Sequence, residues 1–98
     1  MQDKPSIRSH PGPELRVKVL KPRKLTVVKS AKLLDMSRGN LSEILAGRRD
    51  MTLEFCHQIA ILFGENAEVW ATKQMQHDLD KKGLEVQKLN LQPYKPRK

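Results

Sequence analysis

A connection of only three residues, Asp35-Met36-Ser37, constrains the fold of this chain more than any other feature of its sequence. Apolar residues recur at helical spacing on both sides of it: Val27, Ala31 and Leu34 before it, and Leu41, Ile44 and Leu45 after it. Two helices joined so tightly cross steeply and pack their inner faces together, and Ala31 is small enough to allow a close crossing. The sequence therefore predicts a helix-turn-helix.

Residues that begin and end helices divide the rest of the chain into short segments. Side chains suited to cap a helix N-terminus occur at Thr26, Ser37, Thr52 and Asn66. Residues that interrupt helical winding follow at Pro22, Gly47, Gly64 and Gly83. The first helix is expected to begin near Pro13, because proline suits a first helical turn. The prediction is five short helices.

The composition supports an all-α fold of one domain. The chain has 98 residues, enough for one modest core. Its aromatic content of 4% is low for a β-sandwich, whose strands are rich in such residues. We expect a flexible N-terminal arm over residues 1–11, a helical domain over residues 12–82 and a basic tail over residues 83–98. The tail is compatible with a short strand, an arm or a disordered segment.

The charge is distributed unevenly. Residues 1–49 contain 12 Lys/Arg and 4 Asp/Glu, a balance of +8, whereas residues 50–98 contain 7 of each. Between Arg16 and Lys32 there are seven basic residues and no acidic one. A polyanionic partner explains this asymmetry, and a basic surface that only aids solubility is the simpler alternative.

The start of the third predicted helix carries side chains suited to base recognition. In a DNA-binding helix-turn-helix this end enters the major groove, where arginine can pair with guanine and asparagine with adenine. Glycine lets the backbone come near the DNA, and serine hydroxyls and basic side chains can meet phosphates or base edges. The predicted DNA-binding residues are Thr26, Lys29, Ser37, Arg38, Gly39, Asn40, Ser42, Arg48 and Arg49.

Catalysis and metal binding find little support in the sequence. Cys56 falls in an apolar row of the fourth helix and is expected in the core, whereas His57 is expected at the surface. Neither these two nor His10 and His77 show the spacing of metal ligands or of a nucleophile with its base. We expect no enzymatic activity, cofactor or metal. With a single cysteine, no signal peptide and no apolar run of about 20 residues, we expect a cytoplasmic protein without a membrane segment.

Three residues of the fifth predicted helix are candidates for a core or dimer contact. Trp70 is expected as a core anchor, or in a dimer interface, where tryptophan is enriched. Met75 and Leu79 either extend such an interface or pack on the first and fourth helices. An adaptor that binds only another protein is a further alternative to DNA binding, and a steep salt dependence of binding would separate the two.

Four stretches resemble the HigA-type antitoxins, within the wider Xre/Cro-like (VapI-like) helix-turn-helix repressors. They are HPGPEL (10–15), LTVVKSAKLLDMSRGNLSEILAGRR (25–49), MTLEFCHQIAILFG (51–64) and NAEVW (66–70). The block SRGNLSEILAGRR is the most specific of them, because a stretch similar to SxxxLSxILNGRR is typical of the family. The resemblance covers residues 10–79.

This resemblance implies a five-helix, lambda-repressor-like bundle that forms a homodimer, partly through its C-terminal region. The dimer would bind double-stranded operator DNA at its own promoter, repress transcription and neutralise a small RelE-like toxin that cleaves mRNA on the ribosome. A free-standing repressor without a toxin is the alternative, and the neighbouring gene would discriminate between them. Arg38, Gly39 and Asn40 match positions that face the groove, and Thr26 and Lys29 match positions that meet the backbone.

Four positions depart from the family pattern. Asp35 replaces the usual glycine of the turn, and Lys29 replaces the usual glutamine, which exchanges a directional donor for a point charge. Ala46 stands where asparagine is usual, and Gly39 replaces a longer side chain. Because of these departures, the resemblance does not predict which operator sequence is bound. They do not affect the predicted fold.

Overall fold

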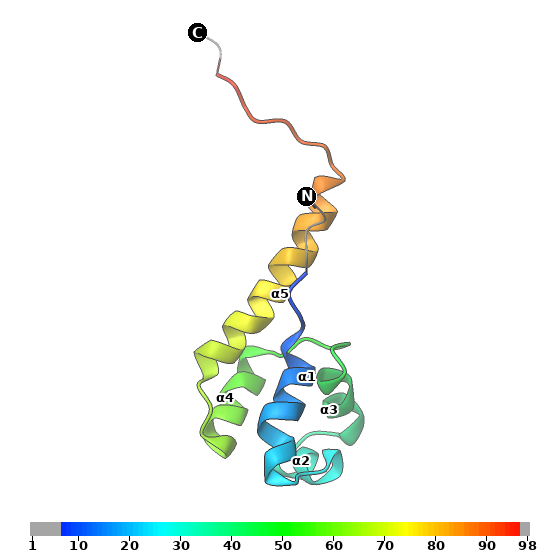
Figure 1. Ribbon diagram of the computed structural model, residues 1–98, viewed down its shortest axis with the longest axis vertical. Helices are drawn as coiled ribbons and strands as arrows, with labels where there is room; N and C mark the ends of the chain where they lie inside the picture. The colour runs from blue at the N-terminus through cyan, green and yellow to red at the C-terminus, as the bar shows by residue number, and fades with distance from the viewer. Residues whose placement is uncertain (1–6, 97–98) are drawn as a thin grey trace.

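The computed structural model describes residues 7–96, which contain helices and no strand. The five α-helices are α1 (Pro11–Leu15), α2 (Val27–Leu33), α3 (Arg38–Leu45), α4 (Leu53–Phe63) and α5 (Ala67–Gln87). A π-helical turn, η1 (Arg16–Leu20), and a 3-10 turn, η2 (Lys21–Arg23), continue α1. Figure 1 shows α1 to α4 gathered into one body, from which the C-terminal half of α5 projects. The predicted all-α, five-helix architecture is confirmed.

The predicted capping residues begin α2, α3, α4 and α5. In each case the side-chain oxygen of the cap accepts a hydrogen bond from a backbone N–H of the first turn; the caps are Thr26, Ser37, Thr52 and Asn66. Gly47 and Gly64, which follow α3 and α4, have φ angles of 83° and 71°. Glycine adopts this left-handed region without steric cost, so both residues end their helices as predicted.

The first helix differs from the prediction at both ends. It begins at Pro11 rather than near Pro13, because the His10 side chain caps it. Its winding changes before Pro22, which lies inside η2 instead of directly ending the helix. In an α-helix, the Pro22 ring would clash with the carbonyl of Lys18, and the wider turn of η1 replaces that winding.

The last helix is longer than predicted. Gly83 was expected to end it, but α5 continues through Gly83 to Gln87. No heavy atom lies within 4 Å of a Cβ placed at Gly83, so this glycine has only a modest propensity cost inside the helix. After a turn at Lys88 and Leu89, the residues up to Pro96 have no regular secondary structure.

The core lies where the five helices meet. It consists of Leu15, Val19, Leu20, Ala31, Leu34, Leu41, Ile44, Leu45, Met51, Phe55, Cys56, Ile59, Phe63 and Trp70. Arg23 closes it at the end of α4, because its guanidinium donates to the carbonyls of Val19 (2.9 Å) and Phe63 (3.0 Å) and lies over the Phe63 ring. One of the seven basic residues between Arg16 and Lys32 is therefore a structural contact.

The backbones of α1 and α3 lie in direct contact. A Cβ at Gly12 would overlap the carbonyl oxygen of Ile44, so only glycine fits at this position. The Gly12 N–H is occupied by its hydrogen bond to His10 Nδ1. The HPG string thus begins α1 and allows its close approach to α3.

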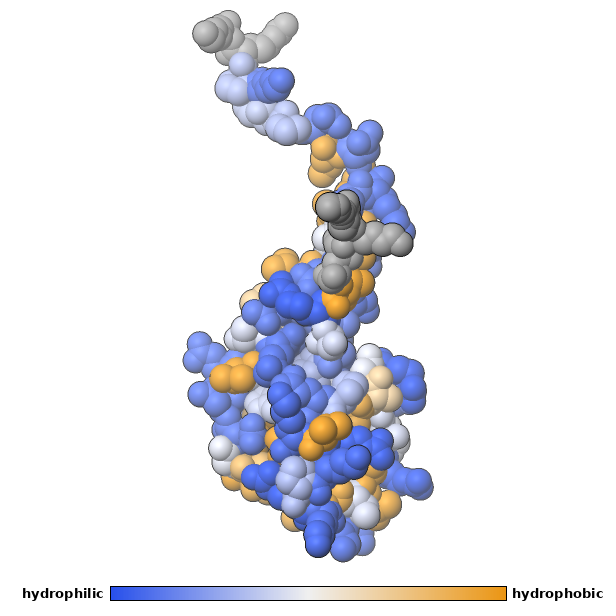
Figure 2. All heavy atoms as spheres, in the orientation of Figure 1, coloured by the Kyte–Doolittle hydropathy of each residue, from blue (hydrophilic) through white to orange (hydrophobic). Residues whose placement is uncertain are grey.

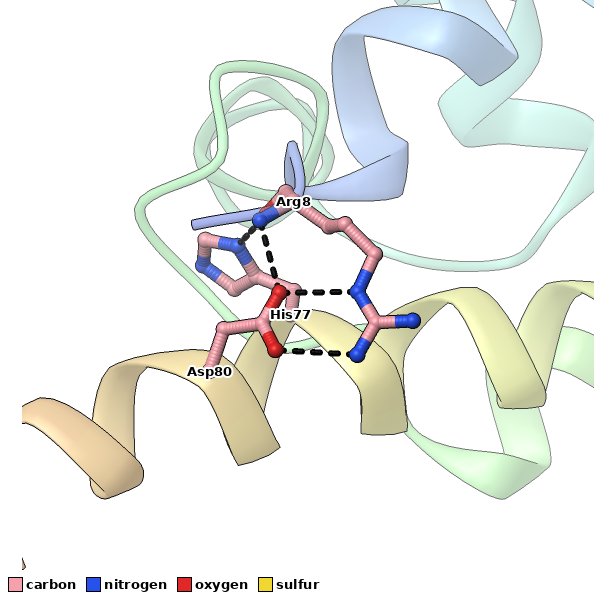
Figure 3. A network of polar contacts seen from close by, with 3 residues as sticks. All are labelled: Arg8, His77 and Asp80. Carbon is pink, nitrogen blue, oxygen red and sulfur yellow. Dashed lines mark hydrogen bonds and ion pairs between the residues drawn. The ribbon is translucent and has the colours of Figure 1, made fainter. Parts of the chain in front are cut away.

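The described part of the N-terminal arm is fastened to α5. Asp80 accepts hydrogen bonds from the backbone N–H of Arg8 (2.8 Å) and from its guanidinium (2.8 and 2.9 Å), and His77 Nδ1 donates to the Arg8 carbonyl (Figure 3). These contacts with Arg8 hold the pKa of Asp80 at about 2. A free arm was expected over residues 1–11; residues 1–6 lie outside the described part, and residues 7–11 are held in place.

Within residues 7–96, none of the helices is both long enough and apolar enough to cross a membrane.

Candidate nucleic-acid interface

The turn between α2 and α3 has the tight geometry of a helix-turn-helix. Met36 donates its N–H to the carbonyl of Ala31 (3.0 Å), and Asp35 donates to Lys32 (3.2 Å). Asp35 has a φ of 53°, in the left-handed region that glycine usually occupies and that aspartate tolerates better than most residues. The departure from glycine at this position therefore leaves the turn intact.

The N-terminus of α3 exposes two polar side chains without structural partners. Ser37 Oγ accepts the N–H of Asn40 (3.0 Å) and fixes the start of the helix. Arg38 and Asn40 are exposed, and neither side chain makes a hydrogen bond or ion pair to any described residue. Their hydrogen-bond donors and acceptors are available to a ligand. They lie at the N-terminus of α3, the end of such a helix that a DNA major groove can accommodate.

Gly39 has no structural reason to be glycine. It lies within α3 without a positive φ, and a Cβ there would meet no heavy atom within 4 Å. Glycine at such a position costs about 1 kcal/mol in helix propensity relative to alanine. The start of α3 is therefore open to a close approach at Gly39.

The nine predicted contact residues are all exposed, and they lie on the start of α2, on α3 and on the loop that follows α3. Thr26 caps α2, and Lys29 lies in the first turn of that helix. Arg48 is held by Glu43 through its Nε and Nη2 atoms at 3.0–3.2 Å, which lowers the pKa of Glu43 and raises that of Arg48. Nη1 of Arg48 and the whole side chain of Arg49 have no partner among the described residues.

His10 holds the loop after α3, which the sequence did not predict. Its Nδ1 accepts the Gly12 N–H (2.9 Å), so the proton resides on Nε2, which donates to the carbonyl of Arg49 (3.1 Å). Burial, and next the neighbouring His77, lower the pKa of His10. One imidazole thus joins the start of α1 to the segment that carries Arg48 and Arg49. The only sequence signal for this role of His10 is its position directly before Pro11 and Gly12, where it caps α1.

Gln74 is the second buried polar residue that the sequence did not indicate. Its Oε1 accepts the N–H of Met51 (2.8 Å), and its Nε2 donates to Asp78 (2.9 Å). The bond to Met51 ties the α3–α4 connection to α5, and a longer one from Nε2 to Asp50 (3.4 Å) does the same. Gln74 lies 23 residues from Met51, and no local pattern marks such a partner.

Of the residues considered for catalysis, His10 and His77 make structural hydrogen bonds, and His57 is exposed as predicted. Cys56 is buried in the core, as predicted, and burial raises the pKa of its thiol. No group of three or more His, Cys, Asp or Glu side chains within residues 7–96 is placed to hold a metal ion.

The chain has a curated relative over most of its length, although no family model matches it. Virulence-associated protein I from Dichelobacter nodosus is 32% identical over 82 residues, which cover 84% of this chain and 76% of the relative. The chain belongs to this VapI-like, HigA-type antitoxin family.

Solved structures agree with this assignment. An addiction module antidote protein of the HigA family from Coxiella burnetii is 26% identical, with a TM-score of 0.74 over 91% of this chain and 100% of that one. The antitoxin HigA from Pseudomonas aeruginosa, solved with the higBA promoter, has a TM-score of 0.80 over 91% of this chain and 97% of that one. At 20% identity, this second likeness shows the fold alone.

The fifth helix of this HigA-type chain separates a core residue from exposed ones. Trp70 is 4% exposed and donates from Nε1 to Glu65 (2.8 Å), which confirms the core anchor. Met75 and Leu79 are 52% and 61% exposed. Both side chains are therefore mainly exposed to solvent, and neither belongs to the buried core.

Proposed function

We propose that this protein is the antitoxin of a type II toxin–antitoxin pair, and that it binds its own operator DNA as a dimeric transcriptional repressor. The observation that carries this proposal is the exposed start of α3, where Arg38 and Asn40 have no partner within the described residues and Gly39 opens the backbone. In this proposal the protein acts by binding DNA and toxin, not by catalysing a reaction. Arg38 and Asn40 read bases, whereas Thr26, Lys29, Ser37, Ser42, Arg48 and Arg49 position the helix on phosphates or base edges.

The relatives support both parts of the proposal. The Coxiella burnetii structure is described as an antidote protein of an addiction module, and the Pseudomonas aeruginosa structure contains a promoter. By its resemblance to HigA-type antitoxins, the chain is proposed to neutralise a RelE-like toxin that cleaves mRNA.

A homodimer fits the exposed apolar residues of α5. Met75, Leu79, Val86 and Leu89 are 44–64% exposed along α5 and the turn that follows it. Apolar side chains are visible on this part of the molecule in Figure 2. A second copy packed along α5 would cover them and present two α3 helices to successive major grooves, about 34 Å apart.

The first experiment measures fluorescence anisotropy of the protein on a duplex from upstream of its own gene and on a scrambled duplex, at several salt concentrations. We expect tight, strongly salt-dependent binding to the promoter and a preference of at least about a hundredfold over the scrambled duplex. Equally weak binding to both duplexes would contradict the repressor.

The free-standing repressor differs from the antitoxin only in its lack of a toxin. Co-expression of the adjacent short reading frame with and without this chain separates them. Growth arrest by that reading frame alone, relieved by this chain, is the expected result; a harmless neighbouring product that does not bind the chain would leave a repressor without a toxin.

A further inference from the structure

A hollow lies beside the predicted interface, between η1 and the start of α2. It has a volume of about 290 Å³, and the residues with polar side chains that line it are Arg16, Lys21 and Thr26. Its apolar wall is formed by Leu20, Leu25, Val27 and Leu45. The hollow is thus lined both by two cationic residues, Arg16 of η1 and Lys21 of η2, and by Thr26, which caps α2.

The unusual winding of η1 brings the two cations to one side. In an α-helix, five residues correspond to about 140° of rotation, which would turn Arg16 and Lys21 apart. Here the Lys21 N–H donates to the Arg16 carbonyl, so residue 21 lies above residue 16 across one wide turn. Such π turns are rare and frequently occur at functional sites.

Neither cation has an internal partner among the described residues, which distinguishes them from their neighbours. On the same stretch, Lys18 pairs with Glu14 (3.0 Å), and Arg23 binds carbonyls at the end of α4. Arg16 and Lys21 are exposed and make no side-chain hydrogen bond or ion pair within residues 7–96. Among residues 7–96, no acidic side chain lines the hollow, so the positive charge of Arg16 and Lys21 is available to an anion.

Thr26 adds a hydrogen-bond donor to this charge. Its Oγ1 accepts the N–H of Lys29 (3.1 Å) as the cap of α2, and its hydroxyl hydrogen remains free to donate. A guanidinium, an ammonium and a hydroxyl together match the oxygens of a phosphate group.

We propose that Arg16, Lys21 and Thr26 form a binding site for a backbone phosphate of duplex DNA, flanking the bases read by α3. The inference rests on the proposed function, and it adds Arg16 and Lys21 to the residues that hold the operator. The site positions the protein without reading sequence, because phosphate contacts carry no base information.

The test compares the wild type with Arg16→Ala/Lys21→Ala on the promoter and scrambled duplexes across a salt series. Each phosphate contact contributes about 0.9 to the slope of log affinity against log salt, so loss of this one contact should lower the slope by about 0.9. The affinity deficit of the variant should therefore shrink about 3.5-fold between about 50 mM and about 200 mM salt. The ratio of promoter to scrambled affinity should stay unchanged.

Two variants serve as controls. Lys81→Ala/Lys82→Ala removes the same number of charges from the projecting half of α5 and should leave the slope near that of the wild type. Arg16→Lys/Lys21→Arg keeps both charges and should also retain the slope. Thermal melts establish that every variant is folded before it is titrated.

A duplex with single methylphosphonate substitutions, each of which removes one backbone charge, locates the contact. At one flanking position the substitution should weaken the wild type and have no further effect on Arg16→Ala/Lys21→Ala. An unchanged salt slope in that variant, or an equal loss of slope in Lys81→Ala/Lys82→Ala, would overturn the phosphate site while leaving the repressor intact. Absence of promoter preference in the wild type itself would instead refute the proposed function.

Discussion

Arg38 and His10 act on opposite ends of α3. Arg38 is exposed at the start of the helix, whereas His10 fixes the loop beyond its end through the Arg49 carbonyl. The first could be identified from the sequence, because a polar residue directly after a cap in a helix-turn-helix has a known geometry. The second could not, because its partner lies 39 residues away.

Substituting Arg38 tests base recognition directly. Arg38→Ala should weaken promoter binding by about 1–3 kcal/mol, the value of a bidentate contact to guanine, and should affect a scrambled duplex much less. Lys29→Ala is the matched control, since loss of a phosphate contact should weaken both duplexes alike. Anisotropy titrations measure both. Equal losses of Arg38→Ala on the two duplexes would show that Arg38 does not read a base.

The stability of the protein should depend on pH through His10. Protonation of Nδ1 removes the acceptor for the Gly12 N–H, and burial keeps the pKa of His10 below its unfolded value of about 6.5. The unfolded chain therefore binds the proton first, so the stabilisation is complete above about pH 6.5 and is lost as the pH falls below it. Asp80, with a pKa of about 2, stays ionised across this range.

The measurement is the melting temperature between about pH 7.5 and about pH 5, compared with that of His10→Asn. Asparagine keeps an acceptor for the cap but does not titrate. The groups that act on His10 electrostatically, His77, Asp50 and Asp78, are present in both proteins. A smaller decrease in the variant is expected, and parallel curves would show that His10 does not carry the dependence.

At the scale of helices, local chemistry predicted most starts and ends. Caps need only a side chain and the next turn of backbone, which is why Thr26, Ser37, Thr52 and Asn66 could be assigned. The failures have local causes that the residue types do not reveal. His10 serves as an unusual cap, Pro22 is accommodated by a change of winding, and Gly83 is followed by residues that continue the helix.

Gly83 gives a prediction for α5. Gly83→Ala should strengthen the projecting half of the helix by up to about 1 kcal/mol, because the new Cβ meets no heavy atom within 4 Å. Amide exchange at residues 84–87 should slow and helical circular dichroism should increase. The global melting temperature should change little, since this end of α5 extends beyond the body (Figure 1). Faster exchange in the variant would mean that position 83 requires glycine.

For the whole molecule, the sequence predicted more of the fold than of the surface features and long-range contacts. The apolar stripes fixed which helix faces meet, and Trp70 lies in the core as expected. The hollow at Arg16 and Lys21 escaped prediction because it depends on a π turn, and the contact made by Gln74 depends on a loop and a helix that are distant in sequence.

Self-association provides the prediction at this scale. Met75→Ser/Leu79→Ser should shift the sedimentation mass from dimer to monomer at concentrations where the wild type is a dimer, without a large loss of monomer stability, because both side chains are mainly exposed. Trp70→Ala is the contrasting variant and should cost about 3–5 kcal/mol of folding free energy. An unchanged mass in the double variant would remove these two residues from the interface.

The contact between Gly12 and the Ile44 carbonyl has a mechanical consequence. Because backbone touches backbone there, no flexible side chain is available to absorb relative movement of α1 and α3. His10 reinforces the same junction through its hydrogen bonds to Gly12 and to the Arg49 carbonyl. A partner that displaced α1 would therefore shift α3 as well, so the N-terminal end of the chain is mechanically linked to the helix that carries Arg38.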